Sequence, residues 1–112
     1  MTATREAQLW LAQRVSAMVL ALCVAVHLAT IVYAVRGGLT AQEILTRVQG
    51  HAGWAIFYVV FTFAVAIHAT LGLRAILIEW LPLHGPTFDF ALAVTGIALA
   101  VFGLRAVWAV WA

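Results

Sequence analysis

The sequence predicts an all-α integral membrane protein whose single domain, residues 1–112, crosses the bilayer with three transmembrane helices. Hydrophobic residues make up 66% of the 112 residues and charged residues only 9%. This is the composition of a membrane protein rather than of a soluble domain. Three apolar runs are also long enough for a helix to cross the ~30 Å hydrocarbon core of a bilayer. We expect these spans at approximately residues 14–36, 51–81 and 88–111.

The first span follows a short amphipathic lead-in that ends at Arg14, with Trp10 placed for the membrane interface. From residue 15 to residue 35 the chain carries no formal charge. A polar connector, residues 39–49, leads to the second span, and Thr40 is well placed to cap one short helix within it.

A proline marks the end of the second span. The residue before a proline is disfavoured in the α conformation, so Pro82 predicts that the helical pattern stops at Leu81. Thr87 is expected to cap the third helix, and Asp89 suits the first turn of that helix. The third span is interrupted only by Arg105, and its two tryptophans are expected in an aromatic belt.

Charge and cysteine content exclude several classes of function. The net charge of +2 is too small and too scattered for nucleic-acid binding. The single Cys23 lies in an apolar run, so no disulfide framework exists.

Three arginines are expected on each side of the membrane, which leaves the orientation undetermined by charge. His51 and His84 are expected at wetted ends of the spans.

His68 is the strongest candidate for a functional residue. Ionisable residues are rare inside membrane helices unless they have a function, and imidazole is a natural axial ligand for haem iron. Gly72 follows one turn later on the same face, where a flat macrocycle would need room. Arg74 and Glu79 come where the helix should leave the hydrocarbon, and they could hold propionates, a lipid head group or a partner protein. The alternative is that His68 only hydrogen-bonds another helix.

His27 is expected at a different depth from His68. In a three-span hairpin Arg14 and Arg74 lie on the same side, with His27 roughly 20 Å from Arg14 and His68 roughly 9 Å from Arg74 along the helix axes. The two imidazoles are therefore not expected to clamp one haem within this chain. Each is expected to face a histidine of another subunit, giving two haems at two depths. Neighbouring side chains offer the His27 ring few partners, because Cys23 is a weak donor and Thr30 can satisfy one ring nitrogen at most, so iron would satisfy the other. The alternative is that His27 makes an interhelix hydrogen bond.

Arg14 and Ser16 are polar candidates at the start of the first span. Arginine presents a fixed fork of donors and stays charged, so with Ser16 nearby it could hold a quinone carbonyl or a haem propionate. The alternative is an arginine that snorkels at a helix end. No acidic residue lies within an uncharged core, which weighs against a small proton-coupled exporter.

These residues give the chain a resemblance to the cytochrome b membrane-anchor subunit of succinate dehydrogenase and fumarate reductase. That family carries H-R-[VIT]-[ST]-G at the start of its first helix, where residues 13–17 here read QRVSA. The dihaem members and some related members also have a histidine thirteen residues after the motif arginine, which is His27 here. The family's second-helix motif, H-x3-G-[IL]-R-x4-D, is matched by His68, Gly72, Leu73, Arg74 and Glu79.

The chain departs from the family pattern at four positions. Gln13 and Ala17 replace the family histidine and glycine, and Glu79 replaces aspartate. Trp10 stands where many relatives place a serine that contacts quinone.

The resemblance implies half of a haem-binding helical bundle, completed by a second membrane-anchor subunit. Haem b would be held at His68, in surroundings that include Gly72 and Arg74. The depth argument adds a second haem, shared with the partner subunit, at His27. A quinone pocket, or a contact to a haem propionate, would form near Trp10, Arg14 and Ser16.

The resemblance also implies a complex of the respiratory chain and the tricarboxylic acid cycle. A flavoprotein subunit would oxidise succinate or reduce fumarate, and an iron–sulfur subunit would exchange electrons with the membrane. This chain would carry electrons between the iron–sulfur subunit and quinone, with no enzymatic activity alone. The location would be the bacterial inner membrane, with the Arg14 and Arg74 side facing the cytoplasm. There are two alternatives: a haem-free structural anchor of the same type of complex, and an unrelated small transporter or assembly protein.

Overall fold

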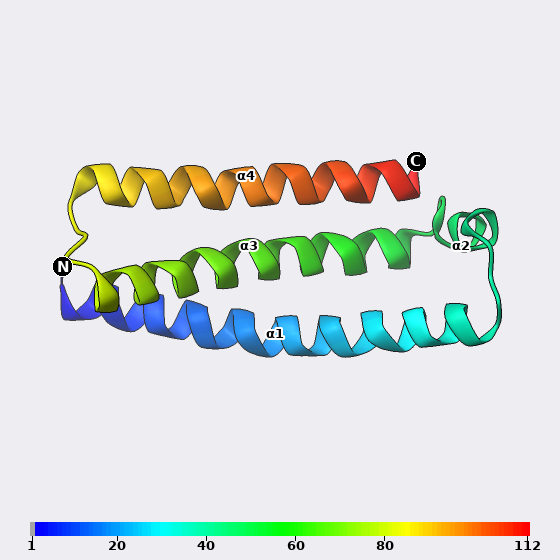
Figure 1. The fold of residues 1–112 in the computed structure, drawn as a ribbon, viewed down its shortest axis with the longest axis horizontal. Helices are drawn as coiled ribbons and strands as arrows, with labels where there is room; N and C mark the ends of the chain where they lie inside the picture. The colour runs from blue at the N-terminus through cyan, green and yellow to red at the C-terminus, as the bar shows by residue number, and fades with distance from the viewer. Residues whose placement is uncertain (1) are drawn as a thin grey trace.

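Three long helices and one short helix build the chain in the computed structural model, which describes residues 2–112. The helices α1 (Ala3–Arg36), α3 (Ala52–Trp80) and α4 (Pro86–Trp111) run antiparallel in succession, with α3 between the other two (Figure 1). The short α2 (Ala41–Val48) lies at one end of this layer, near the C-terminus. The described part of the chain contains no strand, so the predicted all-α class is confirmed.

The three long helices are suited to an apolar solvent. Each is long and apolar enough to cross a membrane, and large apolar side chains are exposed along all three. A helix that is hydrophobic all round requires lipid or other protein on its outer faces. The buried residues are few and mostly small: Ser16, Cys23, Ala64, Ala66 and Leu92.

The predicted lead-in is continuous with the first span. Thr2 caps α1, because its hydroxyl oxygen accepts a hydrogen bond of 3.2 Å from the backbone nitrogen of Arg5. From there α1 runs without a break to Arg36. Its 34 residues extend about 51 Å at 1.5 Å per residue, more than the hydrocarbon core requires. The first turns of α1 therefore reach beyond the apolar region at the end opposite α2.

The connector contains the predicted capped helix, and that helix is attached to α1. The Thr40 hydroxyl accepts a hydrogen bond from the Glu43 nitrogen at 3.2 Å, and the Glu43 carboxylate accepts one from the Thr40 nitrogen at 2.7 Å. This reciprocal capping box confirms the expectation for Thr40. Arg47 of α2 donates to the Tyr33 hydroxyl at 3.4 Å and lies over the Tyr33 ring, which links α2 to the end of α1.

The end of α4 is joined to the segment between α2 and α3. The Gly50 nitrogen donates to the Trp111 carbonyl at 3.1 Å, and the Trp111 indole donates to the His51 carbonyl at 3.1 Å. Gln49 reaches the carbonyl of Ala112 at 3.2 Å. These bonds fix the level of the last turn of α4 relative to the first turn of α3.

The turn between α3 and α4 corrects one prediction. Leu81 is extended, with φ −131° and ψ 147°, as expected for the residue before Pro82. The N-cap of α4 is Gly85 rather than Thr87, however, and the proline after Gly85 is the first helical residue. Gly85 adopts φ 102°, which is open to glycine but strained for threonine, and a proline with its fixed φ is favoured at the first position. Asp89 lies in the first turn, as predicted.

Small residues bring α3 and α4 into close contact at two levels. A Cβ atom added to Gly96 would lie 2.9 Å from the Thr70 hydroxyl oxygen. One added to Gly103 would lie 3.2 Å from the Thr62 hydroxyl oxygen and closer still to the Thr62 methyl group. Glycines at such contacts let membrane helices approach closely.

Candidate functional site

His68 lies on the stripe of α3 that also carries Phe61, Val65 and Gly72, at helical spacings of three, four and seven residues. Its ring is half-buried, and its Nδ1 is buried without a hydrogen-bond partner among residues 2–112. An unpaired buried polar atom costs about 1–3 kcal/mol. The Nδ1 atom of His68 therefore has no partner among these residues. A group outside the described chain could supply one.

The face of Gly72 is turned towards α1. A Cβ atom added to Gly72 would lie 3.3 Å from the Nε2 atom of Gln13. The Oε1 atom of the same Gln13 side chain is buried and without a partner in the described part of the chain. Gly72 thus gives Gln13 room to pack between α1 and α3. Whether it also makes room for a macrocycle stays a prediction.

His27 of α1 is held between aromatic rings of α3. Its ring lies 5.5 Å from the Phe61 centroid and 5.9 Å from the Tyr58 centroid, both edge-on. Its Nδ1 is buried and unpaired within residues 2–112. The Thr30 hydroxyl donates to the backbone carbonyl of His27 at 2.7 Å, so it does not serve the imidazole. His27 therefore resembles His68: each imidazole lies among apolar side chains, and the Nδ1 atom of each has no hydrogen-bond partner within residues 2–112.

The two histidines lie at different levels of the layer. The contact with Phe61 places His27 at the level of that residue. His68 follows Phe61 by seven residues on α3, which is about 10 Å along the axis at 1.5 Å per residue. The depth difference expected from the sequence is therefore present in the fold.

A cavity of about 430 Å³ lies beside His27, at the end of the layer that α2 covers. Apolar side chains make most of its wall, while His27, Tyr58 and Thr62 supply polar groups. The sequence analysis did not identify Tyr58 and Thr62 as candidates. Their spacing of four residues, which places both on one face of a helix, is the feature of the sequence that could have identified them. The remaining lining residues are Ile44, Leu45, Val48, Phe61, Val65, Leu99, Gly103, Ala106, Val107 and Val110.

Of the three predicted quinone-pocket residues, the structure brings only two together. The Arg14 guanidinium lies 5.1 Å above the Trp10 ring, and both side chains are exposed. Ser16 is buried against α3, where its hydroxyl donates to the Gln13 carbonyl at 3.0 Å. Two residues rotate a helix by about 200°, so Arg14 and Ser16 point to opposite sides of α1. Within this chain they do not line one pocket.

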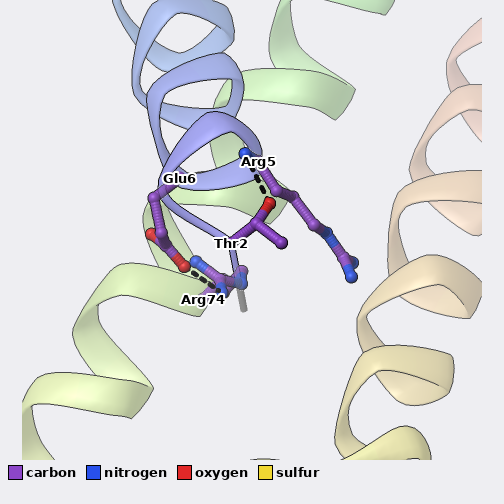
Figure 2. Close-up of polar contacts among 4 residues, drawn as sticks. All are labelled: Thr2, Arg5, Glu6 and Arg74. Carbon is purple, nitrogen blue, oxygen red and sulfur yellow. Dashed lines mark hydrogen bonds and ion pairs between the residues drawn. The ribbon is translucent and has the colours of Figure 1, made fainter.

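Arg74 is held at the N-terminal end of α1. Figure 2 shows its guanidinium against the carboxylate of Glu6, with a distance of 3.4 Å between Nη2 and Oε1. The Arg74 side chain is 16% exposed, whereas Glu6 is 53% exposed. Water screens such a pair, whose worth is about 0–1 kcal/mol. The contact confirms that Arg74 and the start of α1 lie at the same end of the layer. The second-helix motif did not predict Glu6 as the partner of Arg74.

No cluster of three or more His, Cys, Asp or Glu side chains that could hold a metal ion exists within residues 2–112. His27 and His68 are single imidazoles at separate levels. His51 and His84 are exposed near the helix ends, as expected.

Three long apolar helices with few buried residues define a multi-pass membrane protein. Comparison with known families gives the family: a profile described as succinate dehydrogenase/fumarate reductase transmembrane subunit matches residues 1–104. The chain therefore belongs to this family and is a membrane-anchor subunit. No curated protein and no solved structure matches the chain.

Proposed function

We propose that this anchor subunit binds haem b through His68 and carries electrons between an iron–sulfur subunit and membrane quinone. The observation that supports this most is the unpaired Nδ1 of His68 inside an apolar span. A ligating histidine uses one ring nitrogen for iron and gives the other to a hydrogen-bond acceptor. Haem, when bound, supplies one-electron redox chemistry. His68 holds it, and the surrounding helices exclude water from it.

His27 serves a second haem in this proposal. Two observations support this assignment: the Nδ1 atom of His27 is buried without a hydrogen-bond partner within residues 2–112, and a cavity of about 430 Å³ lies beside the ring. The depth offset of about 10 Å keeps the two sites separate. A second anchor subunit would contribute the partner histidines and cover the apolar surface beside His27 and His68.

Quinone would bind at the end of the layer that carries Arg14. Trp10 and Arg14 form a cation–π pair on the exposed side of α1, which offers a ring face and charged donors to a quinone carbonyl or to a haem propionate. Because Ser16 faces α3 instead, its contribution requires that quinone enter between α1 and α3. We assign this end, which also carries Arg74, to the cytoplasmic side of a bacterial inner membrane, where the flavoprotein and iron–sulfur subunits dock.

The test of haem binding is His68→Ala in the intact complex. The expected result is loss of a b-type signal from the reduced-minus-oxidised spectrum while the complex still assembles. His84→Ala is the matched control, because His84 is an exposed histidine in the turn after α3, and it should leave the spectrum unchanged. An unaltered spectrum and haem content in His68→Ala would contradict the assignment.

A further inference from the structure

Arg105 is a charged residue within the apolar length of α4. It precedes Trp111, the last residue of the helix, by six positions, or about 9 Å. Two residues before it, Gly103 packs against Thr62, which is next in sequence to Phe61, the neighbour of His27. Arg105 therefore lies near the level of His27, well inside the end of the layer.

The side of α4 that carries Arg105 faces away from the other helices. Gly103 faces α3, and two further residues rotate the helix by about 200°. Arg105 is exposed and lines a shallow hollow formed by α4 alone. The hollow is lined by Val101, Leu104, Arg105, Trp108 and Ala109.

No hydrogen bond or ion pair joins the Arg105 side chain to any residue in 2–112. Of the four acidic residues, only Glu43 lies at the α2 end, and its carboxylate is engaged in the capping box with Thr40. Charge is costly in hydrocarbon, and an anion beside the guanidinium would offset that cost. Its long side chain can reach towards the interface to meet one.

We propose that Arg105 and Trp108 form a binding site for an anionic phospholipid on the outer edge of α4. The guanidinium binds the phosphate through its fork of donors. Trp108, one turn nearer the helix end and 66% exposed, lies at head-group level. Val101 and Leu104, on the other side of Arg105, offer apolar contacts to an acyl chain. Lipid is the favoured occupant because the hollow is on the outer edge, whereas the unpaired histidine nitrogens lie in α1 and α3.

The experiment measures phosphatidylglycerol binding to the intact, delipidated complex by native mass spectrometry, with phosphatidylcholine as the reference lipid. Arg105→Gln should weaken the preference for phosphatidylglycerol about fivefold, as expected for one arginine near an anionic surface. Arg105→Lys should retain most of it. Arg36→Gln removes an exposed arginine at the same end, where α1 stops, and should leave the preference unchanged.

Two results would overturn the proposal. The first is an Arg105→Gln complex that prefers phosphatidylglycerol as strongly as the parent. The second is an Arg105→Gln complex that loses another membrane subunit, which would identify a partner carboxylate as the anion. Both readouts are independent of haem content, so this proposal and the haem assignment can fail separately.

Discussion

Replacing Gly103 with alanine should destabilise the α3–α4 contact. The added Cβ would lie 3.2 Å from the Thr62 hydroxyl oxygen, 3.3 Å from its Cβ and closest to its methyl group. Overpacking of this kind costs about 1–3 kcal/mol. Alanine recovers about 1 kcal/mol of helix propensity over glycine. The net destabilisation is therefore about 0–2 kcal/mol, centred near 1 kcal/mol.

Thr62→Ala should rescue the Gly103→Ala variant, because it removes both the methyl group and the hydroxyl that the new Cβ meets. The assay is the temperature at which the detergent-solubilised complex loses its size-exclusion peak. Gly53→Ala is the control for helix propensity, since a Cβ there meets no atom within 4 Å, and it should be neutral or stabilising. Equal midpoints for the Gly103 and Gly53 variants, or no rescue by Thr62→Ala, would refute the packing argument.

Three further predictions concern separate parts of the chain. His27→Ala should lower the haem content of the complex from two to one, and one haem in the parent or two in the variant would exclude a second haem at His27. Arg14→Leu should reduce quinone reductase activity while activity with a soluble artificial acceptor persists, whereas equal retention of both would show that Arg14 only snorkels. Thr40→Ala should destabilise α2 by about 0.5–2 kcal/mol through loss of its cap, measured as faster hydrogen exchange at residues 41–48; unchanged exchange would show that the bonds of Arg47 hold α2 instead.

The sequence was sufficient for features governed by local chemistry. Long uncharged runs predicted the spans, Pro82 predicted the end of α3, and Thr40 predicted the capped helix. Helical rise alone predicted the offset between His27 and His68, because both lie on straight antiparallel helices.

Features that depend on tertiary context could not be predicted in the same way. Gly85 caps α4 in place of Thr87 because the turn requires a positive φ. The cavity beside His27 takes its wall from all four helices, so no single stretch of sequence contains its pattern. Glu6 is almost seventy residues from Arg74 in sequence, and only the antiparallel packing brings the two together.

We propose above all that this anchor subunit holds haem b in its membrane layer. The most direct measurement is a pyridine haemochrome spectrum of the complex purified through a tag on this chain, with haem quantified against the amount of the chain. We predict a b-type spectrum with at least one haem per chain, co-purifying with flavin and iron–sulfur subunits. A complex that contains those subunits but no haem would contradict the account and identify the chain as a haem-free structural anchor.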